Sequence, residues 1–285
     1  MLDWIAEVMH ARSARRGERI CELWSGYGEV FRVELAGGLA PTAVVKHVRP
    51  PPGQTDVSDA RKRRSYDVEA TFYRDYAPRC DDSCRVAYLY GSWVTPDEWV
   101  FVLEDLDASG FPEPDDQCEG PTIADASLAW LAAFHARFLG DAGAGLWPTG
   151  TYWHLATRME ELEEIEGTEL HAAAAALDEE LAAARYQTIL HGDAKFSNFC
   201  FAPDHRTAAA FDFQYAGRGC AMKDLAYVLF DHHGEADITS EEDYLELYFS
   251  YLRAAPRDDR IDIAAVEAEW RALYPVAMLD FCRFY

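Results

Sequence analysis

The N-terminal third of the chain alternates apolar and polar positions over short stretches, which is typical of half-buried β-strands. Such stretches lie at 30–35, 41–50, 84–91 and 98–105. Three- and four-residue apolar spacing predicts a short amphipathic helix at 2–15 and a longer helix at 60–77. This part of the sequence therefore predicts a small sheet with one main helix beside it.

Beyond residue 121 the apolar spacing becomes mainly helical. Helices are expected at 127–140, 155–166, 168–185, 240–254 and 261–284. A different pattern interrupts them at 188–213, where short apolar runs are separated by polar breaks. This pattern predicts a strand, a loop and a hairpin. Catalytic groups often lie on loops that a rigid scaffold holds in place.

The same interrupted stretch concentrates side-chain oxygen. Asp193, Asn198 and Asp212 all lie within twenty residues of one another, and a hairpin would bring the last of them back toward the first two. Carboxylate and carboxamide oxygens suit Mg²⁺, which takes few protein ligands and leaves its other positions to water and phosphate. The stretch therefore predicts a magnesium-binding loop.

Three segments carry a family resemblance. HGDAKFSN at 191–198 resembles the HGDxxxxN catalytic loop of the aminoglycoside phosphotransferase and choline kinase superfamily. FDFQ at 211–214 stands where protein kinases have Asp-Phe-Gly, and YAGRGCAMKDLAYVL at 215–229 is most similar to the ecdysteroid-kinase-like branch. The resemblance implies an α+β, two-lobed protein-kinase-like fold. Residues 1–104 would form an N-terminal nucleotide-binding lobe with an antiparallel sheet and one helix, and 105–285 a larger, mainly helical catalytic and substrate lobe.

The resemblance also implies roles in phosphoryl transfer. Asp193 would be the catalytic base that orients the substrate hydroxyl, and Lys195 would neutralise the γ-phosphate. Asn198 and Asp212 would hold Mg²⁺ on the phosphates of ATP. Asp224, which by itself reads equally well as an acid at a helix start, would brace the catalytic loop. His191 is expected to be structural, and His135 to be a hydrogen-bonded core residue.

The nucleotide site is expected in the first lobe. Gly26 and Gly28 by themselves indicate a hairpin turn, but the lysine strand that follows favours a glycine-rich loop over the phosphates. Lys46, in an apolar strand, needs an anion, and Glu69 is a better partner than other acids of its helix. Glu104 and Leu106 lie in the hinge, where backbone groups would meet adenine.

Composition narrows the partners. The 285 residues carry a net charge of −24, which disfavours nucleic acid and anionic membranes, and no apolar run of eighteen residues predicts a membrane span. Seven cysteines match no zinc or disulfide framework, so free thiols are expected. The start of the chain lacks the order of a secretory signal, and we expect a cytoplasmic protein. The oligomeric state is not predicted.

The expected activity is an ATP- and Mg²⁺-dependent transfer of phosphate to a hydroxyl of a small molecule. The alternative is a catalytically silent nucleotide-binding module, which the intact base and metal residues disfavour. A protein kinase is disfavoured because no long activation segment separates Asp212 from Asp224.

The acceptor stays open at this stage. A polycation resembling an aminoglycoside fits the net negative charge of the protein. A lipid, sterol or sugar alcohol fits the aromatic run at 147–154, whose alternative role is to fill the core. The basic run at 61–64 is expected to be a solvated helix face, and the acidic, proline-rich stretch at 112–121 a loop. The apolar end at 280–285 indicates either a docked terminus or a chain that continues.

Overall fold

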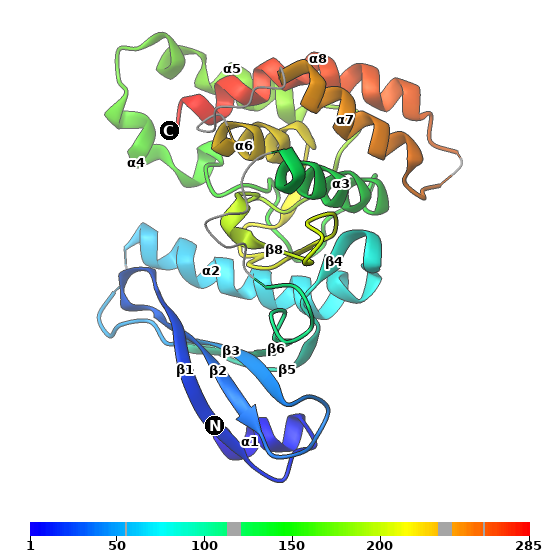
Figure 1. Cartoon of the computed structure of the whole chain (residues 1–285). Coiled ribbons are helices and arrows are strands. Elements are labelled where there is room, and N and C mark those ends of the chain that lie inside the picture. Colours follow the sequence, from blue (N-terminus) through cyan, green and yellow to red (C-terminus); the bar gives the residue numbers. More distant parts are fainter. Residues whose placement is uncertain (55, 113–120, 233–240, 259) are drawn as a thin grey trace.

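The structure is a computed structural model that describes residues 1–54, 56–112, 121–232, 241–258 and 260–285. An antiparallel sheet forms one end of the molecule, and a larger, mainly helical part forms the other (Figure 1). Helix α2 (Val57–Thr71) lies between them and continues into a π-helical turn at Phe72–Tyr76. Most of the loop expected at 112–121 lies outside the described residues.

The N-terminal sheet has five strands in the order β1-β2-β3-β6-β5, and all neighbours are antiparallel. Their bounds are β1 Ala14–Leu23, β2 Gly28–Leu35, β3 Thr42–Val48, β5 Leu89–Thr95 and β6 Glu98–Leu103. The fold class expected from the sequence is therefore confirmed for this part of the chain.

The two faces of the sheet pack against different partners. Phe31 and Val45 share one core cluster with Ile5 of helix α1 (Leu2–Val8). Val48 and Phe101 point to the other face and belong to the main core. Because side chains alternate along a strand, this leaves Lys46 on the face that looks toward α2.

The N-terminal helix is shorter than predicted. It ends at Val8, and strand β1 begins at Ala14, inside the range expected to be helical. Half of the residues of β1 are charged, and most of its residues are exposed. A strand at the edge of a sheet with little burial has no apolar alternation, so periodicity does not reveal it.

The helical part surrounds a small set of short strands. The helices are α3 Pro121–Arg137, α4 Met159–Glu164, α5 Glu169–Ala182, α6 Met222–His232, α7 Glu241–Ala254 and α8 Ile263–Cys282. The strands are β4 Arg85–Val86, β7 Thr188–Leu190, β8 Phe199–Phe201, β9 Ala208–Ala210 and β10 Gly217–Gly219. The predicted strand, loop and hairpin at 188–213 is confirmed: β7 enters the loop, and β8 pairs with β9 in an antiparallel hairpin.

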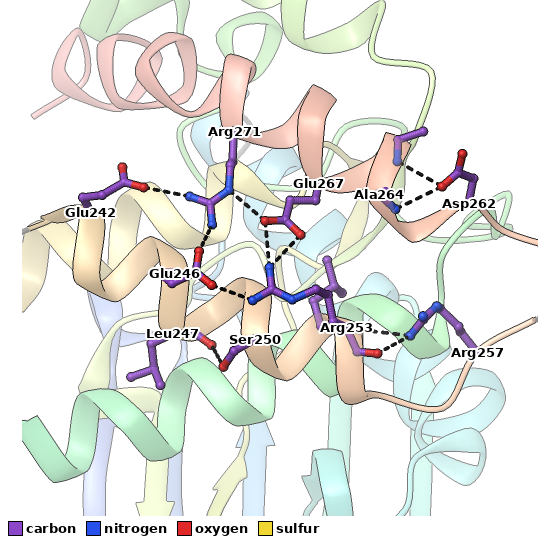
Figure 2. A network of polar contacts seen from close by, with 12 residues as sticks. Glu242, Glu246, Leu247, Ser250, Arg253, Arg257, Asp262, Ala264, Glu267 and Arg271 are labelled. Carbon is purple, nitrogen blue, oxygen red and sulfur yellow. Dashed lines mark hydrogen bonds and ion pairs between the residues drawn. The ribbon is translucent and has the colours of Figure 1, made fainter.

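An ion-pair network joins α7 to α8 at the surface (Figure 2). Arg271 of α8 contacts Glu242, Glu246 and Glu267, and Arg253 of α7 contacts two of the same glutamates. The arginines therefore separate three carboxylates that would otherwise repel one another.

The end of α8 is anchored in the core by buried charges. Asp280 accepts hydrogen bonds from Trp153 (3.1 Å) and Arg283 (2.9 Å) and lies 3.0 Å from the ammonium of Lys223. This matches the docked end that was one of the two expectations for 280–285. No helix in the described part of the chain combines the length and apolarity needed to cross a bilayer.

Candidate active site

Lys46, Glu69 and Asp212 form the centre of the site and come from three elements. Lys46 Nζ lies 2.9 Å from Glu69 Oε1 and 2.7 Å from Asp212 Oδ1. Burial opposes the charge of Lys46, but Asp212 and Glu69 together raise its pKa above the usual value. Burial likewise raises the pKa of Glu69 to about 7, an effect that Lys46 opposes. The lysine–glutamate pair predicted from the sequence is confirmed, and the lysine reaches the carboxylate of the catalytic hairpin as well.

The segment after β9 holds Asp212 in place. Its backbone has φ of +66°, a left-handed conformation that aspartate tolerates better than most residues. Gln214 donates from Nε2 to Asp212 Oδ1 (2.8 Å) and accepts from the hydroxyl of Ser65 on α2 (3.2 Å). Phe213 stacks on Phe72, with ring centroids 3.7 Å apart. Gln214, at the position that is glycine in protein kinases, therefore adds a contact with α2 through Ser65, next to the stacking of Phe213 on Phe72.

Asp193 lies in the loop after β7. Its Oδ2 accepts from Asn198 Nδ2 (2.9 Å) and lies 3.6 Å from Lys195 Nζ. Burial raises the pKa of Asp193 to about 6, and the charge of Lys195 opposes that rise. The carboxyl group is therefore still mainly ionised at neutral pH and has a higher proton affinity than an exposed aspartate.

Buried hydrogen bonds fix the backbone of this loop. Asp224 accepts from the backbone N–H of His191 (2.7 Å) and of Gly192 (2.9 Å), which confirms the predicted brace. Its Oδ2 also lies 3.1 Å from His135, whose other ring nitrogen contacts the hydroxyl of Tyr248 (2.9 Å). His135 is thus the hydrogen-bonded core histidine that the sequence indicated.

His191 supports the loop as a neutral ring. Its Nε2 contacts the carbonyl oxygen of Phe211 (3.0 Å), which can only accept, so the proton lies on Nε2. Its Nδ1 accepts from the backbone N–H of Asp193 (3.3 Å). Burial also lowers the pKa of His191 below its usual value, which agrees with a structural rather than a basic role.

The two predicted glycines lie between β1 and β2. Gly26 has φ of +72°, and Gly28 has φ of +143° with the carbonyl oxygen of His47 only 2.0 Å from where a Cβ would lie. The first glycine therefore permits the turn and the second permits close packing on β3. Both requirements are structural, and contact with a nucleotide stays a prediction.

The hinge is tied down by charged side chains. Glu104 pairs with Arg85 (2.5 Å) and accepts from the backbone N–H of Tyr88 (3.1 Å). Arg32 of β2 makes two hydrogen bonds to Asp105, at 2.6 and 3.2 Å. Leu106 is buried, and its carbonyl accepts from Phe111 N (2.8 Å). The side chain of Glu104 thus stabilises the backbone of the hinge. A role in adenine binding for Glu104 or Leu106 stays a prediction.

The segment at 150–153 connects the catalytic loop to Tyr215. Tyr152 N donates to the carbonyl of Gly192 (2.9 Å), and Thr151 N donates to the carbonyl of Tyr215 (3.3 Å). The rings of Tyr152 and Tyr215 lie 5.9 Å apart. Trp153 is fully buried in the core. The aromatic run thus divides between core and a wall that lies near Asp193.

Some functional candidates were not predicted. Arg61 and Arg64 are half-buried and donate to carbonyl oxygens of Thr157 and Gly145, so the expected solvated face is wrong for these two residues. Ser65 lies four residues before Glu69 on α2, and this helical spacing is the signal by which it could have been found. No comparable signal in the sequence points to Arg158 or Tyr215.

The donor atoms fit Mg²⁺. Asn198 uses Nδ2 to donate to both the carbonyl and the carboxylate of Asp193, which leaves its amide oxygen for a ligand. Asp212 supplies carboxylate oxygen and follows Phe211, whose backbone N–H donates to the carbonyl of Asn198 (3.1 Å). Hard oxygen donors, few in number, are the type of set that Mg²⁺ takes alongside phosphate and water.

The antiparallel sheet, the interposed helix and the helical part with a braced catalytic loop define a protein-kinase-like fold. A family model described as "phosphotransferase enzyme family" matches residues 19–259, so the chain belongs to that family. A sequence comparison with curated proteins gave no match. The proposed ecdysteroid-kinase-like branch is not confirmed by these comparisons.

Several solved structures share the fold. An ethanolamine kinase of Plasmodium vivax aligns with a TM-score of 0.57 at 11% identity, over 95% of this chain and 75% of that one. An aminoglycoside phosphotransferase mutant in complex with ADP and hygromycin B gives 0.54 at 12% identity, over 98% and 89%. An aminoglycoside phosphotransferase of Streptomyces rimosus with ADP and streptomycin gives 0.52 at 15% identity, over 90% of each chain.

Proposed function

We propose that this protein transfers the γ-phosphate of ATP to a hydroxyl group of a small molecule. The observation that carries the proposal is the junction of Lys46, Glu69 and Asp212 beside the braced Asp193 loop. Phosphoryl transfer depends mainly on positioning and charge neutralisation, and this junction provides both. Residues 1–104 would hold the nucleotide and 105–285 the catalytic loop and the acceptor.

The roles follow from the contacts. The hydroxyl oxygen of the acceptor attacks the γ-phosphorus, its proton passes to Asp193 Oδ, and the bond to the bridging oxygen breaks to leave ADP. Lys46 would contact the α- and β-phosphates and Lys195 the γ-phosphate. Asn198 and Asp212 would hold Mg²⁺, which when bound neutralises charge on the phosphates. A cytoplasmic setting agrees with the described cysteines, none of which forms a disulfide bond.

Replacement of the base tests the activity. We expect Asp193→Asn to lower phosphotransfer by at least ~10²-fold, the usual scale for a positioned acid or base. Binding of ATP with Mg²⁺, measured by calorimetry, should survive because Lys46 and Asp212 are unchanged. The assay follows ADP formation with a panel of hydroxyl compounds.

A matched variant controls for disturbance of the loop. Asp204 also lies in this hairpin, but it is exposed and caps a turn through Arg206 N. Asp204→Asn should leave the rate unchanged. Equal rates for the wild type and Asp193→Asn would contradict the base assignment, and ATP binding without any transfer by the wild type would favour a silent nucleotide-binding module.

A further inference from the structure

Two half-buried arginines from distant parts of the chain meet near the catalytic loop. Arg61, near the start of α2, donates from Nη1 to the carbonyl of Thr157 (2.6 Å). Arg158, one residue before α4, donates from Nε to the carbonyl of Tyr152 (2.6 Å). Their side chains are only 9% and 13% exposed. The contacts fix both guanidinium groups rather than leaving them in solvent.

Arg158 is connected to the catalytic loop through Tyr152, because its guanidinium group lies 5.8 Å from the centroid of the Tyr152 ring and the backbone N–H of Tyr152 donates to the carbonyl of Gly192, next to Asp193 (2.9 Å). The pKa of the Tyr215 hydroxyl is raised by burial, lowered by Arg158 and Arg61, and raised by Asp193, so all three charges act on this one group. Burial raises the pKa of Tyr152 to about 12, Asp193 adds to that rise and Arg158 opposes it. The backbone contacts place Tyr152 between Arg158 and Gly192, the residue before Asp193, and place Tyr215 beside Thr151.

The carboxylates that contact Arg61 and Arg158 compensate only part of the positive charge of the two guanidinium groups. Among the described side chains, Glu161 is the carboxylate that contacts both arginines, with Oε1 2.9 Å from Arg158 Nη1 and 4.0 Å from Arg61 Nη2. Two guanidinium charges thus share one carboxylate. A half-buried cation in such a setting is stabilised by a further anion.

Glu161 also offers a contact of the opposite polarity. Its Oε2 is buried and has no hydrogen-bond partner among the described residues. Because protein atoms cover this oxygen, a ligand hydroxyl could donate to it only after the Glu161 side chain turns. The region around Tyr152 and Arg158 therefore combines two guanidinium groups, a carboxylate and two aromatic rings.

We propose that the acceptor carries an acidic group, a carboxylate or a phosphate, beside its hydroxyls, and that Arg158 and Arg61 bind this group while a hydroxyl faces Asp193. The inference rests on the proposed phosphotransferase function. The sequence left the choice open between a polycation, which fits the net charge of −24, and a lipid, sterol or sugar alcohol, which fits the aromatic run. The two guanidinium groups would bind an anion locally, although the protein as a whole is acidic.

Matched sugars test the inference by binding. Glucose, glucosamine, gluconate and glucose 6-phosphate differ in charge but share hydroxyl groups, and each is titrated calorimetrically into the protein with Mg²⁺ and a non-hydrolysable ATP analogue. We expect the two acids to bind more tightly than glucose, and glucosamine to bind most weakly. Tighter binding of gluconate than of the phosphate, or the reverse, identifies which acid the site prefers.

A variant connects the charge preference to the arginines. Arg158→Gln should weaken binding of the two acids by about tenfold or more, the scale of one charge-assisted hydrogen bond, and leave glucose unchanged. Arg158→Lys should recover part of the loss. Arg74→Gln, which removes an exposed arginine paired with its neighbour Asp75, is the matched control and should change nothing. Thermal melting verifies that each variant is folded.

Three results would overturn the inference. They are a preference for glucosamine, no detectable binding of either acid at millimolar concentration, and an Arg158→Gln effect on the ATP analogue instead of the acids. In each case the Asp193→Asn comparison still reports independently on phosphotransfer. Equal rates for the wild type and Asp193→Asn, or no transfer by the wild type, would instead count against the proposed function itself.

Discussion

Thr151 shows at the level of one residue how the site constrains its backbone. Its φ is +132°, a region that β-branched residues rarely adopt, and its buried hydroxyl has no partner among the described residues. The neighbouring hydrogen bonds to Tyr215 and Gly192 hold this conformation. Strain of this type collects at functional sites and costs about 1–3 kcal/mol.

Removal of the strained side chain should therefore be tolerated or favourable. We expect Thr151→Gly to leave the free energy of unfolding unchanged or raise it by up to ~1 kcal/mol, because relief of strain offsets the added chain entropy. Thr188→Gly is the control, since the hydroxyl of Thr188 is bonded to the carbonyl of His135 (2.8 Å), and it should destabilise. Denaturant unfolding measures both, and a clear loss of stability in Thr151→Gly would contradict the strain.

Most individual residues of the site could be predicted from the sequence because they lie in short motifs. Asp193, Asn198 and Asp212 fall within twenty residues, and Lys46 stands out as a charge in an apolar strand. Arg61 and Arg158 are 97 positions apart, and only the packing of α2 on the 155–158 segment brings them together. Local patterns contain no record of such a contact, so the charge around the acceptor could not be predicted.

At the level of elements, the network between α7 and α8 makes a prediction about salt. Arg271→Met would leave Glu242, Glu246 and Glu267 close together with only Arg253 between them (Figure 2). We expect the free energy of unfolding to fall by about 1 kcal/mol at low ionic strength and by less at high salt, because salt screens the repulsion. Thermal or denaturant unfolding at two salt concentrations measures it.

The control for this prediction is a simpler ion pair. Among the described residues, Arg260 pairs with Asp258 alone, two residues away, and it is largely exposed. Arg260→Met should cause no measurable change at either salt concentration. If Arg271→Met lowered the free energy of unfolding by the same amount at both salt concentrations, packing of the side chain rather than the ion pairs would account for the loss.

Elements were predicted well where burial is regular and poorly where it is not. Strand β3 and helix α2 have buried faces, and periodicity located both to within a few residues. Strand β1 has almost no buried side chain and was assigned in part to a helix. The hydrogen bond from Ser65 to Gln214 was not predicted, because a small polar residue on a helix face indicates no particular partner outside that helix.

Across the whole molecule, Lys46 joins the sheet to the helical part through Asp212. The same carboxylate is the proposed ligand of Mg²⁺, so without nucleotide the lysine and the metal compete for it. We expect Lys46→Met to strengthen binding of Mg²⁺ alone and to weaken binding of ATP with Mg²⁺, because the competing cation and the phosphate contact are lost together. Calorimetry with each ligand separately and in combination measures both effects.

Arg49→Met is the control, since Arg49 follows the same strand but is exposed and contacts Glu98. It should change neither affinity. Weaker binding of Mg²⁺ alone to Lys46→Met would show that the two cations do not compete at Asp212.

The shared carboxylate has a thermodynamic consequence. In the proposed reaction, metal alone would enter beside the ammonium of Lys46, and nucleotide alone would bring its phosphates toward Asp212 without a divalent cation between them. Each ligand removes the penalty of the other, since phosphates draw Lys46 away and the metal then neutralises both. Their affinities must therefore be linked reciprocally, so that ATP raises the affinity for Mg²⁺ by the same factor as Mg²⁺ raises the affinity for ATP.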